Sequence, residues 1–384
     1  MIHSGIQRAS SAKSIAEALA PMETPIRISR LLKELSAQAF DGLLVTSPVN
    51  IRYLTGFSGS AGLLLVSAEH TVLTSDGRYG DQMREELEQA GTAGVIDEVV
   101  IGSIRDQQEA IIRAAAILSK VGLEASQVSW AQARLWKQML SGSEVLPSDG
   151  VVERLRLIKD AGEIARIARA ASIADEALSR VLPLLKSGAT EREVAAALDH
   201  EMRLLGASAS AFETIVAAGV DGAKPHARPG SRRIVPGEPV VIDFGAVMDG
   251  YRSDMTRTFC VGPPADPVVE RMLQVVLESQ QAGVQAVAPG VQARTVDATC
   301  RQIIAAAGWG EAFSHGTGHG VGLDIHEAPA VGATVADILD PGTVVTVEPG
   351  VYLAGIGGVR IEDTLEVTAD GRRTLTEFPK DCLI

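Results

Sequence analysis

Cysteine is scarce in this chain of 384 residues, and long apolar runs are absent. The three cysteines, Cys260, Cys300 and Cys382, are far apart and odd in number. Neither a disulfide framework nor a CxxC metal site is therefore expected, which is typical of a reducing cytoplasm. No run approaches the ~18 apolar residues of a membrane span, and the first residues lack the apolar core of a signal peptide. We expect a cytoplasmic protein that does not enter a membrane.

Basic residues are outnumbered, because 35 Lys and Arg stand against 48 Asp and Glu, for a formal net charge of −13. An acidic surface repels phosphate backbones and anionic lipids, so we expect neither nucleic acid nor a membrane surface as a partner. The composition, 46% hydrophobic and 22% charged, is that of a globular protein. The length is sufficient for two domains.

The chain divides into an N-terminal extension and two domains. Residues 1–25 form the extension. Residues 26–150 alternate helical and strand patterns, which predicts an α/β domain. The turn residues Pro147 and Gly150 then mark a boundary. Residues 151–384 form the second domain.

The second domain contains a weak internal repeat. Two segments predict amphipathic helices, LKSGATEREVAAALDHEMRLLGA and VAPGVQARTVDATCRQIIAAAGW. Two further segments repeat as strands and include a Pro-Gly near the start, VPGEPVVIDFGAVMDGYRSDMTRTFCV and DPGTVVTVEPGVYLAGIGGVRIEDTLEV. Each half supplies two acids in matching positions, Asp243 and Asp254 in one and Glu348 and Glu362 in the other. We expect a pseudo-twofold site where the halves meet.

Histidine is also scarce, yet three of the seven histidines fall in one short segment, HGTGHGVGLDIHEAP. They are His315, His319 and His326. Histidine is the commonest metal ligand and titrates near neutral pH. Glycine lets a backbone approach a ligand closely. This segment, rich in histidine and glycine, therefore predicts an active site.

The four repeated acids predict that this site binds metal. Asp243 and Glu348 end apolar runs typical of buried strands, and Asp254 and Glu362 lie in strands that return from tight turns. Four converging carboxylates would repel one another and raise their own pKa values, and two divalent cations would cancel their charge. With His319 they form an oxygen-rich ligand set, which suits Mn²⁺, with Co²⁺ and Zn²⁺ as alternatives.

Four motifs of the second domain resemble the ligand pattern of the methionine-aminopeptidase-like, or pita-bread, metallopeptidases: IDFGAVMDGYRSDMTRTF, HGTGHGVGLDIHEAP, VEPGVY and GGVRIED. The chain is most similar to the proline-specific branch, aminopeptidase P and prolidase. Two motifs of the first domain resemble the creatinase-type N-terminal domain of that branch, NIRYLTGFSGSAGLLL and DGRYGDQ. The resemblance implies an α/β creatinase-like domain followed by an α+β pita-bread catalytic domain with an internal pseudo-twofold repeat.

The resemblance also implies a role for each metal ligand. Asp243 would bind one cation, and His319 and Glu348 would bind the other. Asp254 and Glu362 would bridge the two. A water activated between the cations would then attack the carbonyl carbon of an Xaa-Pro bond.

Catalytic and substrate-binding residues follow from the same resemblance. His226 would lie near the scissile bond, and His326 would contact the substrate carbonyl or the developing oxyanion. Glu348 would relay a proton to the proline nitrogen, which must be protonated to leave. Arg360 would support this chemistry from behind the ligands. The residues implied to line the substrate pocket are His315 and Tyr352.

Three other functions share part of this pattern. A methionine aminopeptidase would use the same five ligands, but the α/β N-terminal domain and His315 argue against it. A creatine-hydrolysing enzyme has the same two-domain shape, but its activity does not use the metal pair. A non-enzymatic binding module of this fold usually loses ligands, and none is missing here.

Within the proline branch, an aminopeptidase accepts Xaa-Pro peptides of varied length, whereas a dipeptidase requires a free carboxylate after proline, normally held by a cation. Arg52, Arg78 and Arg228 are candidates for that clamp. The sequence favours an Xaa-Pro aminopeptidase, with an Xaa-Pro dipeptidase as the alternative. A homodimer is expected, because the resemblance implies that the N-terminal domain borders the active site of a neighbouring subunit.

Overall fold

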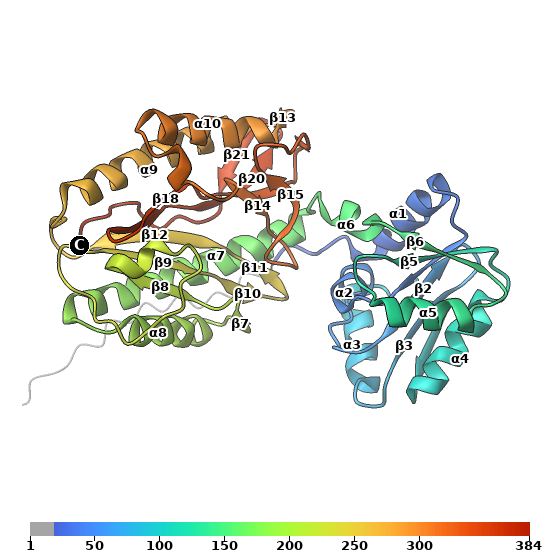
Figure 1. Cartoon of the computed structure of the whole chain (residues 1–384). Helices are drawn as coiled ribbons and strands as arrows, with labels where there is room; N and C mark the ends of the chain where they lie inside the picture. Colours follow the sequence, from blue (N-terminus) through green and yellow to red (C-terminus); the bar gives the residue numbers. More distant parts are fainter. Residues whose placement is uncertain (1–18) are drawn as a thin grey trace, which may run out of the picture.

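The computed structural model describes residues 19–384, which form two domains joined by a short helix (Figure 1). Most of the predicted N-terminal extension, residues 1–25, lies outside the described residues. Among the helices of the described part, none is long and apolar enough to cross a membrane.

The first domain is built on a six-stranded sheet with the strand order β4-β3-β2-β1-β5-β6. Three of its neighbouring pairs are parallel, β1 with β5, β5 with β6 and β3 with β4, and the other two pairs are antiparallel. The strands are β1 Gly42–Val45, β2 Leu63–Ser67, β3 Thr71–Ser75, β4 Glu98–Ile101, β5 Lys120–Glu124 and β6 Glu144–Ser148. The helices are α1 Thr24–Ala37, α2 Pro48–Thr55, α3 Gly80–Ala90, α4 Ile104–Ala115 and α5 Trp130–Met139.

Both faces of this sheet are covered, which explains why the central strands β1 and β2 are almost continuous apolar runs. In β1, Leu43 and Val45 pack into the cluster formed with α1, α2 and α3. Leu44 between them packs into the opposite cluster, formed with α4 and α5. Successive side chains of a strand point to opposite faces, so an alternating pattern is not needed here.

The two domains are connected by α6 (Val151–Arg156) and the start of α7 (Ala161–Val181). Asp160 caps α7, since its side chain accepts a hydrogen bond from the backbone N–H of Glu163. Arg27 of α1 forms ion pairs with both acids, at 2.7 Å and 3.2 Å. The first domain is therefore anchored to the helix that opens the second.

The second domain consists of two similar halves. In each, two helices pack on an antiparallel sheet, and the two sheets lie between the helix pairs (Figure 1). The first half contains α7, α8 Glu191–Leu204, β8 Ile215–Ala218, β9 Pro239–Phe244 and β12 Met255–Cys260. The second half contains α9 Pro267–Ala286, α10 Ala293–Ala306, β14 Gly318–Gly320, β15 Glu327–Val331, β17 Val344–Val347, β20 Asp363–Thr368 and β21 Gly371–Thr374.

The predicted repeat is present in the sheets. The first half has the strand order β12-β9-β8, and the second contains β14-β17-β20 within a sheet of five strands. The remaining short strands are β7 Ala209–Ser210, β10 Ala246–Met248, β11 Tyr251–Arg252, β13 Val291–Gln292, β16 Ile338–Leu339, β18 Gly350–Leu353 and β19 Gly357–Arg360. The predicted fold class, an α/β domain followed by an α+β pita-bread domain, is confirmed.

Candidate metal centre

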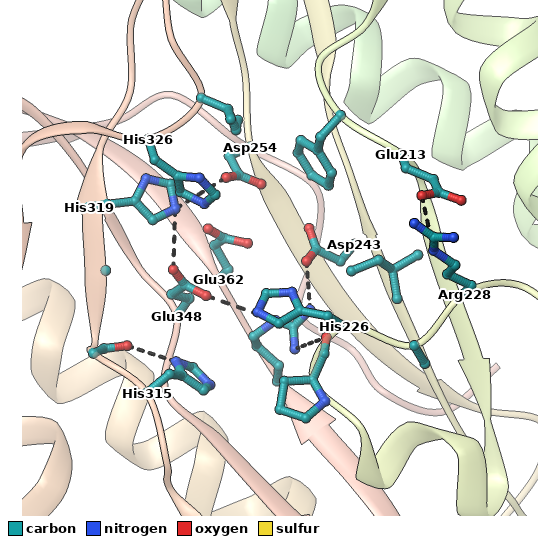
Figure 2. Close-up of a pocket in the computed structure, with 18 residues that line it drawn as sticks. Glu213, His226, Arg228, Asp243, Asp254, His315, His319, His326, Glu348 and Glu362 are labelled. Atoms are coloured by element: carbon teal, nitrogen blue, oxygen red, sulfur yellow. Dashed lines mark hydrogen bonds and ion pairs between the residues drawn. The ribbon is translucent and has the colours of Figure 1, made fainter. Parts of the chain in front are cut away.

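The four repeated acids lie at equivalent strand ends of the two halves. Asp243 is the penultimate residue of β9, and Glu348 directly follows β17. Asp254 directly precedes β12, and Glu362 directly precedes β20. All four acids line one cavity, and their side chains point into it (Figure 2).

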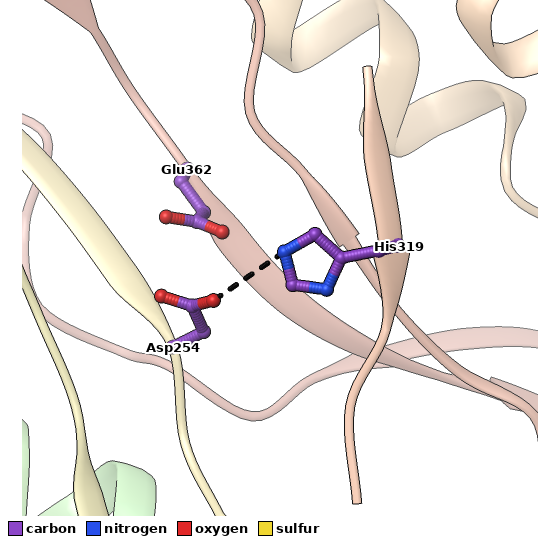
Figure 3. A group of neighbouring side chains, drawn as sticks. All are labelled: Asp254, His319 and Glu362. Atoms are coloured by element: carbon purple, nitrogen blue, oxygen red, sulfur yellow. Dashed lines mark ion pairs between the residues drawn. The ribbon is translucent and has the colours of Figure 1, made fainter. Parts of the chain in front are cut away.

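Three of the predicted ligands form a tight group. Single ligand atoms of Asp254, His319 and Glu362 all lie within 4.8 Å of one another, and the side chains converge on one point (Figure 3). The Nε2 atom of His319 lies 3.5 Å from Oδ2 of Asp254 and 3.4 Å from Oε1 of Glu348. These separations fit oxygen and nitrogen ligands around a shared cation, whose bonds are about 2.0–2.2 Å long.

The glycines of HGTGHG allow His319 to reach this point. A Cβ on Gly318 would lie 2.0 Å from the carbonyl oxygen of Thr346, and one on Gly320 would lie 2.3 Å from that of Ala328. Only glycine therefore lets β14 pack this closely against its neighbours. The Nδ1 atom of His319 lies 3.0 Å from the carbonyl oxygen of Gly320, which leaves Nε2 to face the carboxylates.

The loop that carries His315 and His319 is fixed to α10 by a buried acid. Asp297 accepts hydrogen bonds from the backbone N–H and the hydroxyl of Thr317, at 3.1 Å and 2.9 Å. Arg301 forms an ion pair with Asp297 at 2.8 Å and donates to the carbonyl oxygen of His315. This anchor was not predicted from the sequence, although an acid on the apolar face of a predicted helix is a signal for one.

Burial makes the negative charge of this cluster costly. Burial raises the pKa of Asp254 well above its usual value, and the carboxylates of Glu362 and Asp243 raise it further. The pKa of Glu362 is raised for the same reasons. Burial also raises the pKa of Glu348, to about 8.

Two oxygens of the cluster, Oδ1 of Asp243 and Oε1 of Glu362, are buried without a hydrogen-bond partner in the described part of the chain. An unpaired buried carboxylate oxygen is costly unless a cation or a donor meets it. The donor set, with four carboxylates and one imidazole, therefore fits divalent cations.

Arg360 offsets part of this charge. Its guanidinium is buried and donates to Oδ2 of Asp243 at 2.6 Å, to the hydroxyl of Tyr352 at 2.7 Å and to Thr256 at 3.1 Å. The bond to Asp243 occupies one carboxylate oxygen and leaves Oδ1 directed elsewhere. Arg360 thus orients a predicted ligand, and most of its own donors are already used.

Tyr352 was predicted to line the substrate pocket, but it is not among the residues that line the cavity. Its hydroxyl lies 2.8 Å from Nε2 of His315 and accepts from Arg360, so it packs behind both. His315 does line the cavity. Burial lowers the pKa of His315 to about 4, so its ring is neutral at neutral pH.

The cavity has a volume of about 500 Å³. His226 and His326 line it from different segments, the first before β9 and the second directly before β15 (Figure 2). The apolar part of the lining, which sequence analysis did not identify, comes from Phe212, Ile215 and Ile325.

Of the three arginines that are candidates for the carboxylate clamp, only Arg228 lines the cavity. Arg228 lines the cavity and pairs with Glu213 at 3.4 Å, with side chains 84% and 67% exposed. Arg78 pairs with Asp76 in the first domain, at 2.8 Å. Arg52 packs against Gly250, and neither it nor Arg78 is among the cavity residues.

Comparisons with known proteins agree with this arrangement. A family model described as metallopeptidase family M24 matches residues 165–369, and one described as the creatinase/prolidase N-terminal domain matches residues 27–158. An Xaa-Pro dipeptidase of Pyrococcus furiosus is 35% identical over 93% of this chain and 99% of its own length.

Two solved structures are similar over nearly the whole chain. An Xaa-Pro dipeptidase from Bacillus anthracis has a TM-score of 0.88 at 37% identity and covers 94% of this chain and 100% of its own. An X-Pro aminopeptidase from Thermotoga maritima has a TM-score of 0.83 at 31% identity and covers 93% of this chain and 100% of its own.

Proposed function

The chain belongs to metallopeptidase family M24, and we propose that it is an Xaa-Pro dipeptidase that works with two divalent cations. The observation that carries the proposal is the cavity in which four carboxylates and His319 converge, where two buried carboxylate oxygens have no hydrogen-bond partner among the described residues. The sequence favoured an aminopeptidase. The dipeptidase alternative is better supported, by dipeptidases of P. furiosus and B. anthracis that match nearly the whole chain.

The five predicted ligands would hold the cations, with Asp254 and Glu362 between them. Mn²⁺ is proposed, and Co²⁺ and Zn²⁺ suit the same donors. When bound, the cations would supply Lewis-acid chemistry that lowers the pKa of water and polarises the substrate carbonyl.

The remaining side chains would orient the peptide and move protons. We assign His326, at the edge of the cavity beside the His319 ring, to donate a hydrogen bond to the oxyanion that develops on the substrate. We assign His226 to the opposite side of the scissile bond. Glu348 would carry a proton to the proline nitrogen, which has no hydrogen of its own in the peptide.

Two features of the cavity favour a dipeptide that ends in proline. Phe212, Ile215 and Ile325 offer an apolar wall to the rigid proline ring, which loses little conformational freedom on binding. Within residues 19–384, Arg228 pairs only with the exposed Glu213, and it could exchange that acid for the substrate carboxylate. We therefore propose Arg228 as the clamp that distinguishes a dipeptide from a longer peptide.

The deciding experiment measures alanine release by the Mn²⁺-loaded protein from Ala-Pro, Ala-Pro-amide and Ala-Pro-Ala. Rapid cleavage of Ala-Pro alone supports the dipeptidase. Equal cleavage of all three would contradict it and favour an Xaa-Pro aminopeptidase, the activity of the similar T. maritima structure.

The clamp is tested by Arg228→Met, which should reduce kcat/KM for Ala-Pro about 10- to 100-fold, since a charged hydrogen bond contributes roughly 1.5–3 kcal/mol. It should leave cleavage of Ala-Pro-amide unchanged. Arg78→Met is the matched control, because Arg78 is also an exposed, paired arginine but lies away from the cavity.

The proposal also includes a homodimer in the cytoplasm. Light scattering of the purified protein tests the first part, and cell fractionation tests the second.

A further inference from the structure

A buried cluster of charges lies where the two domains meet, directly beside His326. Its centre is Glu327, the residue after His326 and the first of β15. Its cations are Arg156, the last residue of α6, and Lys159. Helix α6 lies between the domains and contacts β15 (Figure 1).

The ion pairs within this cluster are short. Arg156 reaches one carboxylate oxygen of Glu327 at 2.6 Å, and Lys159 reaches the other at 2.7 Å. The side chains of Arg156 and Lys159 are only 4% and 1% exposed. Burial tends to raise the pKa of Glu327, but Lys159 and Arg156 outweigh it and hold the pKa below its usual value. Glu327 is therefore ionised and fixed at both oxygens.

The cluster continues into the first domain. Arg156 donates to Oδ1 of Asn50 in α2 at 2.9 Å, and the amide of Asn50 donates to Glu124 at 2.7 Å. Glu124 ends β5 and also accepts from the backbone N–H groups of Thr46 and Ser47. A continuous set of buried hydrogen bonds thus runs from the first sheet to Glu327.

His326 itself has few contacts of its own. His326 is exposed, and its ring lies edge-on to the ring of His319, with 4.3 Å between the two centroids. The backbone around it is held instead. Gly322 leaves room for Glu327, because a Cβ there would lie 2.3 Å from the carboxylate. Arg252 binds the other end of this loop through its contacts with Gly322 and Leu323, at 2.9 Å and 3.1 Å.

We propose that Glu327 is a positioning residue, which holds His326 at the cavity and, through Arg156 and Asn50, makes that position depend on the N-terminal domain. The N-terminal domain contributes no side chain to the cavity lining among the described residues. The cluster gives it a role in the reaction nonetheless. The effect on rate rests on the proposed function, because it assumes that His326 acts on the peptide.

The test uses Glu327→Gln, which keeps the shape and removes the charge, and Asn50→Ala, which breaks the link in the other domain. A catalytic group displaced by about 1 Å can cost up to about 100-fold in rate. We expect Glu327→Gln to lower kcat about tenfold or more and Asn50→Ala to lower it severalfold. KM and metal content should stay near those of the unmodified protein.

Both substitutions are then made in His326→Ala. If they act through His326, neither lowers kcat further in that background. If each substitution instead lowered kcat by the same factor in His326→Ala as in the unmodified protein, the effect would be independent of His326 and the proposal would be overturned. Tyr53→Phe is the matched control, since it removes only the hydrogen bond from Tyr53 to Leu155 at the same junction, 3.0 Å long.

Hydrogen–deuterium exchange gives a readout that needs no activity. The peptide covering residues 320–331 should exchange faster in Glu327→Gln and in Asn50→Ala, but not in Tyr53→Phe. Unchanged exchange in Asn50→Ala would refute the link between the domains. If the protein cleaved no Xaa-Pro peptide, the proposed function would fail while the exchange result still tested the link. Should Glu327→Gln not fold, Asn50→Ala carries both measurements.

Discussion

The metal-free protein should become less stable as the pH rises from about 5 to about 9. The reason is the raised pKa of the buried carboxyl groups, seen most clearly for Glu348, whose pKa rises from 4.5 to about 8. Without cations, the folded protein binds a proton at this site that the unfolded chain has already released. Stability is therefore fully present below the unfolded pKa and is lost as the pH rises through the folded one.

The size of the effect follows from the shift. One pKa unit corresponds to about 1.4 kcal/mol, so the change at Glu348 alone corresponds to roughly 5 kcal/mol. Because 17% of the Glu348 side chain is exposed, solvent screens part of this energy. We therefore expect the unfolding midpoint to fall by at least about 5 °C across this range. The shifts at Asp254 and Glu362 have the same sign and add to the fall.

Differential scanning calorimetry of chelator-treated protein at several pH values measures this directly. Adding Mn²⁺ should remove the pH dependence, because bound cations replace the protons and stabilise the folded state by mass action. Glu348→Gln should flatten the slope of the metal-free protein, whereas Glu213→Gln, an exposed acid of the same cavity, should not. A midpoint that stays constant over this range without metal would refute the reasoning.

Three further predictions concern single residues. Asp254→Ala should lose most of the bound metal, and unchanged stoichiometry in metal analysis would contradict its bridging position. His326→Ala should keep its metal while kcat falls about 10²–10³-fold, and near-normal turnover would show that His326 is not a catalytic residue. Arg257→Met should lower stability in urea unfolding by about 3 kcal/mol, because it breaks the buried ion pair with Asp363, 2.9 Å long, which the remaining partners Lys380 and Gln280 only partly replace, and a change below about 1 kcal/mol would contradict this.

The elements that carry the acids were predictable because their signals are local. An apolar run that ends in a carboxylate predicts a buried strand with a charge at its end, and this holds for Asp243 and Glu348. The repeat then predicted that the other two acids would occupy equivalent places. The rest of the cavity was not predictable in this way, because Phe212 and Ile325 lie in segments without a regular pattern.

Contacts between distant segments were also beyond the sequence. Nothing near Glu327 indicates that its partners lie 171 residues earlier, at Arg156. Tyr352 shows the same difficulty, since a tyrosine in a strand beside the metal ligands is expected to face the substrate, yet it supports His315 and Arg360 from behind. Long-range packing decides which face of a strand meets the cavity.

The pseudo-twofold repeat explains why neither half could form this centre alone. Strands β12 and β20 begin beside each other, and each holds the acidic residue of the other half, through the carboxylate of Glu362 in one case and the backbone of Asp254 in the other. The hydroxyl of Thr256 donates to Glu362 at 2.7 Å, and the hydroxyl of Thr364 donates to the carbonyl oxygen of Asp254 at 2.8 Å. The acid proposed to bridge the cations from one half is thus oriented by a threonine of the other. Because each bridging position depends on both halves, the site requires the two halves to pack together, and losing either threonine should disturb the acid across the axis.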